Sequence, residues 1–316
     1  MPRLHVNAQR LIDRSLGRAA AGALVLALVI SFASAPVRAA AAQTILVEGR
    51  SRSYLLYRPV RLEHPGAPAL VVVLHGGFGT GAQAQQAYGW DALAEREGFI
   101  VVYPNGVGRA WNAGGGCCGR PQREHIDDVA FVGTLLRKMI REEGVDPARL
   151  YLTGISNGAA LALAYACASA KPAVAAIGSV AGGISAPCEH PAAVSMLEIH
   201  GESDRNIPLL GGRGSQGVSG VSWLPAPVAV ERFAASAICE TPHTEVRGEV
   251  TTRIASCLAG RTVGLISIAN AGHQWPGARS PGILGRALGL DPPSDALDAT
   301  EALWQFFRAQ RLPETR

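Results

Sequence analysis

The sequence predicts an α/β fold in which one mostly parallel sheet lies between two layers of helices. Continuous apolar runs stopped by glycine are typical of strands that are covered on both faces. Between them lie segments with the periodicity of amphipathic helices. These two kinds of segment alternate along the chain, and parallel neighbouring strands need such crossovers. We see no repeat and no boundary between folding units, so residues 42–316 are expected to form a single domain.

The first expected elements are two edge strands joined by a turn at Glu48 to Ser51. The apolar run 68–77, "PALVVVLHGG", predicts a buried strand, residues 87–99 a helix, and the run 99–106, "FIVVYPNG", a second buried strand. A loop rich in Gly, Trp and Cys follows. A longer helix is predicted over residues 126–147, with acidic residues at its start, where the helix dipole favours negative charge.

The alternation continues to the end of the sequence. The remaining expected elements are a strand at 149–156, a helix at 158–170, strands at 173–182 and 194–201, a helix at 225–239, a strand at 262–272 and a helix at 298–310. One long insertion, residues 280–298, is punctuated by Gly and Pro, and we expect it to be a surface loop near the last helix.

The first 41 residues have the layout of an export signal. Four arginines precede an apolar run, which leads into small residues around Ala35 to Ala42. A membrane anchor or a buried helix is the alternative, but the run is shorter than the roughly 20 residues that a bilayer needs. We therefore expect residues 1–41 to be removed, leaving a secreted or periplasmic protein without a stable membrane anchor.

Removal of this segment also changes the charge balance. The chain has 29 basic and 25 acidic residues, and the first 41 residues contain five Arg and one Asp, which leaves 24 of each sign. A mature chain without net charge offers no general attraction to a polyanion. We therefore expect no nucleic-acid partner.

All six cysteines lie in the expected mature chain, where an oxidising compartment favours disulfides. Cys239 and Cys257 flank a polar segment and are expected to pair with each other. A bond between the adjacent Cys117 and Cys118 would be strained, so we expect each of them to reach a partner elsewhere. Those partners would be Cys167 and Cys188, and the spacing does not decide which pairs with which.

Gly154, Ser156 and Gly158 form the pattern G-x-S-x-G, which follows an expected strand and precedes an expected helix. In this context the pattern predicts a sharp turn that presents a nucleophilic serine above the edge of the sheet. Glycines are expected beside it because side chains there would collide with the neighbouring strand and helix. The alternative is an ordinary serine that caps the helix.

A serine nucleophile needs a histidine base and a carboxylate that orients it. Asp204 lies in the loop after the expected strand 194–201, and His273 follows the next strand along the chain. The order Ser, Asp, His at the ends of successive strands is that of hydrolases with this kind of turn. Glu202 is the alternative acid, but the turn at Asp204 favours the latter.

Backbone N–H groups must stabilise the oxyanion that develops during acyl transfer. The N–H of Asn157, directly after the serine, is one candidate. The second is expected in the loop after an early strand, where we place the N–H of Phe78, with that of Gly77 as the near alternative.

Eight stretches between Arg52 and Phe307 resemble signature segments of one group of α/β-hydrolases. This group comprises secreted esterases related to polyhydroxybutyrate depolymerases, feruloyl esterases and acetylxylan esterases. The stretches are "LVVVLHGG", "YPNG", "WNAGGGCCG", "DDVAFV", "VDPARLYLTGISNGA", "HGESDRNIP", "GHQWPG" and "DATEALWQFF".

The resemblance implies a single-domain α/β-hydrolase and the same triad of Ser156, Asp204 and His273. It also implies that Trp275 and the loop containing Trp111 shape the acyl or alcohol pocket, and we add His75 to the expected substrate contacts. No cofactor is expected, and no metal, since the sequence contains no H-E-x-x-H or similarly spaced ligand set.

The expected partner is a small-molecule or oligomeric ester. No separate substrate-binding module is evident in the sequence, so soluble esters or oligomers are favoured over an insoluble polymer. An acyltransferase using the same triad, and a non-catalytic binding protein with the same fold, are the alternatives. The sequence leaves open the acyl and alcohol groups and the oligomeric state.

Overall fold

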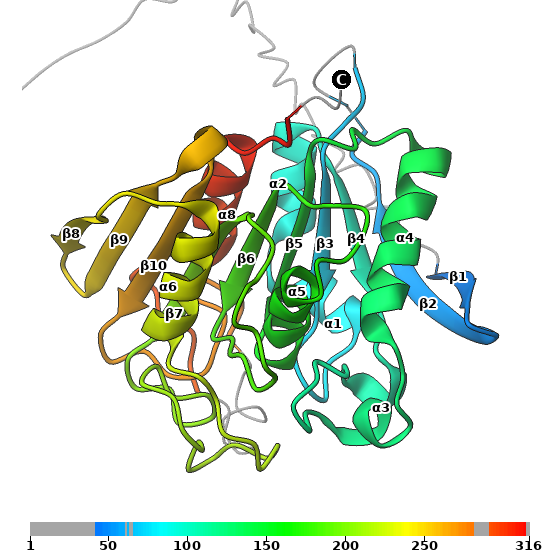
Figure 1. The fold of residues 1–316 in the computed structure, drawn as a ribbon. Helices are drawn as coiled ribbons and strands as arrows, with labels where there is room; N and C mark the ends of the chain where they lie inside the picture. The colour runs from blue at the N-terminus through cyan, green and yellow to red at the C-terminus, as the bar shows by residue number, and fades with distance from the viewer. Residues whose placement is uncertain (1–41, 61, 63–65, 281–290, 314–316) are drawn as a thin grey trace, which may run out of the picture. The chain divides into compact units, whose positions relative to one another are not determined.

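The computed structural model describes residues 42–60, 62, 66–280 and 291–313. Ten strands in these residues form one sheet, in the order β1-β2-β4-β3-β5-β6-β7-β10-β9-β8 (Figure 1). The strands are β1 Ala42–Val47, β2 Arg50–Tyr57, β3 Leu70–Leu74, β4 Ile100–Pro104, β5 Leu150–Ile155, β6 Ala176–Val180, β7 Ser195–Gly201, β8 His243–Arg247, β9 Val250–Ser256 and β10 Thr262–Ile268.

The centre of the sheet is parallel and both of its edges are antiparallel. Strands β4, β3, β5, β6, β7 and β10 run parallel to their neighbours in that order. The hairpin β1–β2 closes one edge, and the hairpin β8–β9 closes the other. This confirms the predicted, mostly parallel sheet. Strand β8 was not among the expected elements because it is exposed along its whole length and has no apolar alternation.

Helices cover both faces of the sheet. They are α1 Gly81–Ala87, α2 Trp90–Glu97, α3 Gly119–Arg123, α4 Asp128–Glu143, α5 Asn157–Cys167, α6 Ala226–Ala237 and α8 Ala299–Arg308. Apolar residues of α4, α5 and α6 share one buried cluster with one face of the sheet, and those of α1, α2 and α8 share a second cluster with the other face. This is the expected three-layered arrangement. The short helices α1 and α3 were not predicted.

The parallel strands bring distant loops to one edge of the sheet. Ile268 at the end of β10 pairs with Gly201 at the end of β7, and Ile155 at the end of β5 pairs with Val180 of β6. The segments after β5, β7 and β10 therefore all leave from the same carboxyl edge of the parallel part of the sheet. In open α/β sheets this edge is where ligands bind.

The disulfides agree with the predicted pairing only in part. Cys239 and Cys257 are bonded, as expected, with their Cα atoms 3.8 Å apart. Cys117 is bonded to its neighbour Cys118, and Cys167 to Cys188, so the expectation of separate partners for the adjacent cysteines was wrong. Cys167 ends α5 beside the loop that contains Cys188, with a Cα–Cα distance of 5.3 Å, so these two cysteines satisfy each other.

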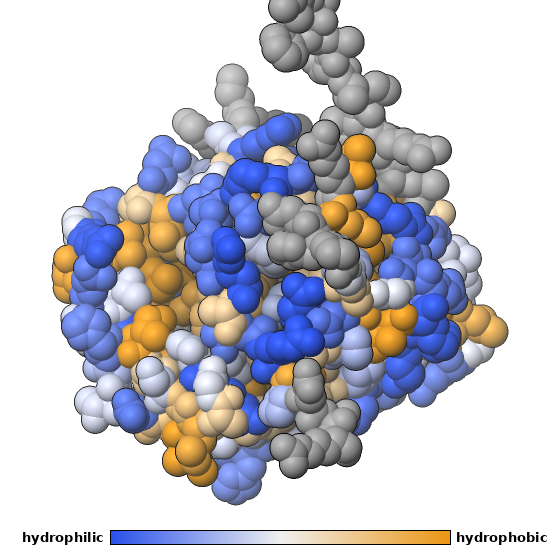
Figure 2. All heavy atoms as spheres, turned by 90° about the horizontal axis from the view of Figure 1, so that it is seen from above, coloured by the Kyte–Doolittle hydropathy of each residue, from blue (hydrophilic) through white to orange (hydrophobic). Residues whose placement is uncertain are grey.

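The expected signal at 1–41 and most of the insertion at 280–298 lie outside the described residues. Within the described part, no helix is long and apolar enough to cross a bilayer. On the face shown in Figure 2, hydrophilic residues lie between separate apolar patches. Such a mixture is normal for folded domains, whose accessible surface is more than half apolar.

Candidate active site

Ser156 lies at a sharp turn between β5 and α5. Its backbone angles, φ 58° and ψ −122°, are in a region that residues other than glycine rarely adopt. A Cβ atom at position 158 would lie 2.5 Å from the His75 carbonyl oxygen, and one at position 154 would lie 2.7 Å from that of Leu74. Both positions therefore require glycine, as the sequence predicted. Without side chains at these positions, the turn can pack directly against the end of β3.

The serine side chain does not cap the helix that follows it. Ser156 occupies the N-cap position of α5, but its hydroxyl accepts no hydrogen bond from the first turn. Its backbone N–H donates to the Val180 carbonyl at 2.9 Å, and the residue is partly exposed. The alternative of an ordinary capping serine is not what the structure shows.

Two of the three expected oxyanion donors have free N–H groups. Among the described residues, the N–H groups of Asn157 and Gly77 have no hydrogen-bond acceptor. The N–H of Phe78 donates to the Arg109 carbonyl at 2.8 Å, so it is already used within the protein. The free pair is therefore Asn157 and Gly77, and Asn157 also begins α5, where the helix dipole favours negative charge.

The side chain of Asn157 has a role that the sequence did not reveal. Its Oδ1 accepts from the Trp111 N–H at 2.7 Å, and its Nδ2 donates to the Trp111 carbonyl at 2.9 Å. This paired bond fastens the Gly- and Cys-rich loop to the first residue of α5. The sequence showed only that an amide side chain directly follows the serine. Nothing in the spacing identified Trp111 as its partner.

The same loop is held from its other side by a buried ion pair. Arg52 Nη2 lies 2.6 Å from Asp128 Oδ1, and both side chains are almost fully buried. Asp128 Oδ2 accepts from the Asn112 N–H at 2.7 Å. Asp127 caps α4 by accepting from the Ala130 N–H at 2.7 Å. The prediction that both aspartates belong to the helix start is confirmed, and Asp128 in addition joins the helix to β2 and to the loop.

Asp204 and His273 form a hydrogen-bonded pair over the carboxyl edge of the sheet. His273 Nδ1 lies 2.7 Å from Asp204 Oδ2, and Asp204 Oδ1 accepts from the N–H groups of Asn206 and Ile207 at 2.8 and 2.9 Å. Burial alone would raise the pKa of Asp204, but the bonds and charges around it, that from His273 foremost, hold this pKa below its usual value. Asp204 is therefore ionised at neutral pH.

Glu202, the alternative acid, does not contact the histidine. Its Oε1 accepts from the Ser267 hydroxyl at 2.8 Å.

A second carboxylate holds the backbone of His273. The His273 N–H donates to Asp291 Oδ2 at 2.8 Å, which the sequence did not suggest because Asp291 belongs to the insertion. The backbone and the ring of His273 are thus each held by a carboxylate.

The serine and the histidine reach the same edge from β5 and β10, which are separated by β6 and β7. Within the described residues, no hydrogen bond joins Ser156 to His273. Catalytic hydrogen bonds are often long in the absence of substrate and tighten when it binds. The structure therefore bonds Asp204 to His273 and presents Ser156 at the same edge of the sheet.

Trp275 and Trp111, two of the three expected substrate contacts, are core residues. Trp275 stacks on Tyr88 with 4.5 Å between ring centroids, and its Nε1 donates to Thr300 Oγ1 at 3.0 Å. Trp111 is fully buried and its Nε1 donates to the His75 carbonyl at 2.8 Å. Neither indole faces solvent, so the expected substrate contacts of both were wrong, and we assign them to the scaffold.

His75, the third expected substrate contact, is also fully buried. Its Nδ1 donates to the Gly76 carbonyl at 2.8 Å, and its Nε2 accepts from the Gly106 N–H at 3.0 Å. Burial lowers the pKa of His75 to about 4, so the ring is neutral at physiological pH. It joins the loops after β3 and β4 rather than contacting a ligand, which corrects the expectation from the sequence.

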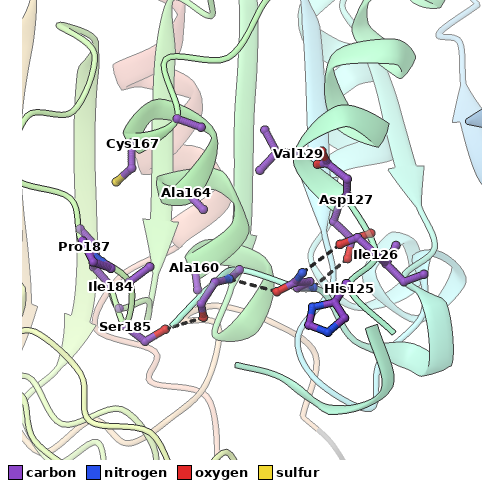
Figure 3. Close-up of a pocket in the computed structure, with 17 residues that line it drawn as sticks. His125, Ile126, Asp127, Val129, Ala160, Ala164, Cys167, Ile184, Ser185 and Pro187 are labelled. Atoms are coloured by element: carbon purple, nitrogen blue, oxygen red, sulfur yellow. Dashed lines mark hydrogen bonds between the residues drawn. The ribbon is translucent and has the colours of Figure 1, made fainter. Parts of the chain in front are cut away.

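A cavity of about 440 Å³ lies beside α5 (Figure 3). Figure 3 shows α5 between two walls: His125 to Val129 on one side, and Ile184 to Pro187 on the other. Ala160, Ala164 and Cys167 of α5 also line it. The Ala160 N–H donates to the Ser156 carbonyl at 2.9 Å, so the cavity begins one helical turn from the serine. His125 belongs to the first of these walls.

Residues 52–259 match the family described as Esterase PHB depolymerase. The chain belongs to this family. It is 28% identical over 275 residues to NocK of Nocardia uniformis subsp. tsuyamanensis, which is named as an esterase, and the match covers 76% of this chain and 75% of that protein. It is 26% identical over 303 residues to a protein of Aspergillus flavus named Probable feruloyl esterase C, with coverages of 90% and 96%.

The fold is shared with solved esterase structures. An acetyl xylan esterase from Aspergillus awamori superposes with a TM-score of 0.58 at 15% identity, over 85% of this chain and 99% of that one. This likeness concerns the fold alone and identifies it as the α/β-hydrolase fold. The predicted resemblance is confirmed, and the protein is an esterase of the PHB depolymerase and feruloyl esterase type.

Proposed function

We propose that the protein is a serine carboxylic-ester hydrolase that acts through an acyl-enzyme, with Ser156 as nucleophile, His273 as base and Asp204 as acid. One observation carries the proposal. The Asp204–His273 pair, bonded at 2.7 Å, lies at the same sheet edge as a serine that is held in a strained turn and whose hydroxyl caps no helix. Structural serines have no need of such a turn.

The hydrogen bond to Asp204 places a proton on His273 Nδ1, which leaves Nε2 free to accept one. As Ser156 Oγ bonds to the ester carbonyl carbon, Nε2 takes the hydroxyl proton, and the carbonyl π electrons move to oxygen. The imidazolium then gives this proton to the leaving alcohol as the C–O bond breaks. Water repeats the sequence on the acyl-enzyme, which releases the acid and restores the serine. Asp204 stabilises the imidazolium in both halves.

We assign the developing oxyanion to the N–H groups of Asn157 and Gly77. Both lack an acceptor within the described part of the chain, whereas the N–H of Phe78 is bonded to Arg109. A donor of this kind contributes roughly 3 kcal/mol to stabilisation of the transition state. The proposal therefore uses two of the three donors expected from the sequence and leaves Phe78 out.

The cavity beside α5 is proposed to take an apolar acyl or aromatic group of the ester. Its volume lies in the range of pockets that hold small molecules, its lining is largely apolar, and it starts one turn from Ser156. Leucine in place of Ala164 would partly fill it. We expect Ala164→Leu to raise KM several-fold for butyl or aromatic esters while leaving acetyl ester turnover near that of the wild type. Equal effects on both substrates would remove the cavity from the proposal.

Soluble esters or oligomers remain the proposed substrates, and export remains the proposed destination. Three disulfides among the described residues suit an oxidising compartment, in agreement with the arginine-rich, apolar start of the sequence. The intact mass of the protein recovered from the periplasm or medium of an expressing bacterium tests this. A mature chain beginning near residue 42 is expected, and a full-length chain retained in the cytoplasm would contradict export.

Replacement of the nucleophile tests the mechanism. Ser156→Ala should lower p-nitrophenyl ester turnover by about 10⁶-fold and abolish covalent labelling by a fluorophosphonate, with the melting temperature retained. Ser203→Ala is the matched control, because Ser203 is exposed on the neighbouring acid loop. It should behave like the wild type. Turnover by Ser156→Ala within tenfold of the wild type would overturn the proposal.

A further inference from the structure

A second histidine lies behind the acid of the proposed triad. His200 and Glu198 are two residues apart on β7, so they project from the same face of the strand. Both are buried, with 1% and 3% of their surface exposed. His200 Nδ1 lies 2.7 Å from Glu198 Oε1, and its Nε2 lies 2.8 Å from the Ile207 carbonyl oxygen and 3.5 Å from Asp204 Oδ2. The mechanism proposed above uses neither His200 nor Glu198.

The partners of the ring indicate its charge. A carbonyl oxygen only accepts, so Nε2 must carry a proton to bond to Ile207. If Glu198 is ionised, Nδ1 must carry one as well, and the ring is an imidazolium. The other arrangement, a neutral ring beside a protonated Glu198, would place no positive charge next to the ionised Asp204. Glu198 Oε1 also accepts from the Gly182 N–H at 3.2 Å, and a hydrogen bond of this kind stabilises a charged carboxylate.

We propose that His200 is a buried imidazolium that positions and tunes the acid of the catalytic triad, with Glu198 as its counter-ion. The inference rests on the proposed function, because it assigns a role relative to Asp204 and His273. His200 is a positioning residue: it acts through Asp204 and touches no reacting atom. It does so by one mechanical and one electrostatic effect.

The mechanical effect passes through the turn after Asp204. His200 Nε2 bonds to the Ile207 carbonyl, while the N–H of the same residue donates to Asp204 Oδ1 at 2.9 Å. The ring therefore holds the peptide segment that orients the carboxylate. Asp204 is fixed from behind by this segment and from the front by His273.

The electrostatic effect is that a positive charge 3.5 Å from Asp204 keeps this carboxylate ionised despite its burial. The charged groups that act on the His200 ring are Glu198 and Asp204, and His273 lies beyond Asp204. Burial by itself would lower the pKa of His200, but the bond and charge of Glu198, followed by the charge of Asp204, raise it above its ordinary value. The proposed mechanism needs an ionised Asp204 to stabilise the imidazolium, so the same positive charge extends that mechanism to lower pH.

Removal of this charge should therefore shift the pH profile. In His200→Gln, an amide can still donate to Ile207, but Glu198 and Asp204 are left without the cation between them. We expect the acid limb of kcat/KM for a p-nitrophenyl ester to move up by roughly one pH unit. The double variant Glu198→Gln/His200→Gln removes both charges and should shift less. His243→Gln, which changes an exposed histidine of β8, is the control and should not move the limb.

A purely structural role for His200 would lower kcat/KM by the same factor at every pH and leave the limb in place, which would overturn the proposal. Should His200→Gln fail to fold, the ring nitrogens of the wild type decide the question by ¹H–¹⁵N NMR at pH 8. Two protonated nitrogens on His200 support the inference, and one protonated nitrogen overturns it. Fluorophosphonate labelling at Ser156 separates the two proposals, since absence of labelling contradicts the triad and leaves the NMR result to judge His200 alone.

Discussion

The two halves of the candidate active site differ in how their polar groups are satisfied. In the acid–base half, formed by the loops after β7 and β10, Asp204 uses both of its oxygens, and His273 is held by ring and backbone. In the nucleophile half, the Ser156 hydroxyl caps nothing and the N–H groups of Asn157 and Gly77 have no acceptor among the described residues. In the acid–base half the charged groups are already paired within the protein. In the nucleophile half the polar groups that we propose to meet the substrate are left free.

The free groups of the nucleophile half are nevertheless supported from behind. The Asn157 side chain holds Trp111 by two hydrogen bonds, Trp111 donates to the His75 carbonyl, and the His75 ring holds Gly106. These supporting side chains are therefore buried and hydrogen-bonded, while the N–H groups that we propose to bind the substrate have no acceptor among the described residues. Donors that are fixed but unpaired cost no reorganisation when an oxyanion forms.

Loss of the negative charge in the acid–base half should have the largest effect. Asp204→Asn keeps the shape but can present an N–H to His273, which favours the wrong tautomer of the ring. We expect kcat to fall about 10⁴-fold with little change in KM. Steady-state kinetics on a p-nitrophenyl ester measure both quantities.

Glu202→Gln is the matched control for this change. Glu202 lies on the same loop, but among the described residues its side chain bonds only to Ser267, so its variant should stay within a few-fold of the wild type. If the effects were reversed, with Glu202→Gln inactive and Asp204→Asn active, the acid would be misassigned and the contrast between the halves would lose its basis.

Loosening the scaffold of the nucleophile half should have a smaller effect. Asn157→Ala keeps the backbone N–H that we assign to the oxyanion and removes both bonds to Trp111. A displacement of about 1 Å in the site can cost roughly 10²-fold in rate, and we expect kcat/KM to fall by about that factor. Faster proteolysis within residues 111–119 should accompany the loss. Unchanged kinetics would show that the loop needs no such anchor.

The sequence predicted what local pattern determines. Continuous apolar runs identified the parallel strands, and the glycines at 154 and 158 identified the sharp turn, because each follows from neighbours along the chain. Many contacts behind the site join distant segments, as Asn157 does with Trp111 or Arg52 with Asp128. No pattern along the chain shows which buried side chains will meet.

The errors have the same origin. An aromatic or histidine residue next to a site residue can face the ligand or the core, and local sequence does not distinguish the two. Trp275, Trp111 and His75 all face the core. The pairing of Cys167 with Cys188 likewise depends on where α5 ends relative to a later loop, and it decided the pairing of the adjacent cysteines as well.

The buried histidines of the two halves provide the last and smallest effect. His75 in the nucleophile half is neutral, with its pKa lowered by burial to about 4 from 6.5. The unfolded chain binds a proton at this residue below about pH 6.5 and the folded chain only below about pH 4. Between these values the unfolded state holds more protons, so stability falls as the pH falls. From pH 8 to pH 5 this contribution is about 2 kcal/mol.

His75→Gln can still donate and accept a hydrogen bond but does not titrate. Urea unfolding at pH 8 and pH 5 should therefore show a pH-dependent loss of stability about 2 kcal/mol smaller in this variant than in the wild type. His243→Gln, at an exposed site on β8, should keep the wild-type dependence. An equal loss in His75→Gln and the wild type would mean that His75 is charged in the folded protein. The nucleophile half would then contain a buried cation, and the distinction between a neutral scaffold on one side and a charged one on the other would fail.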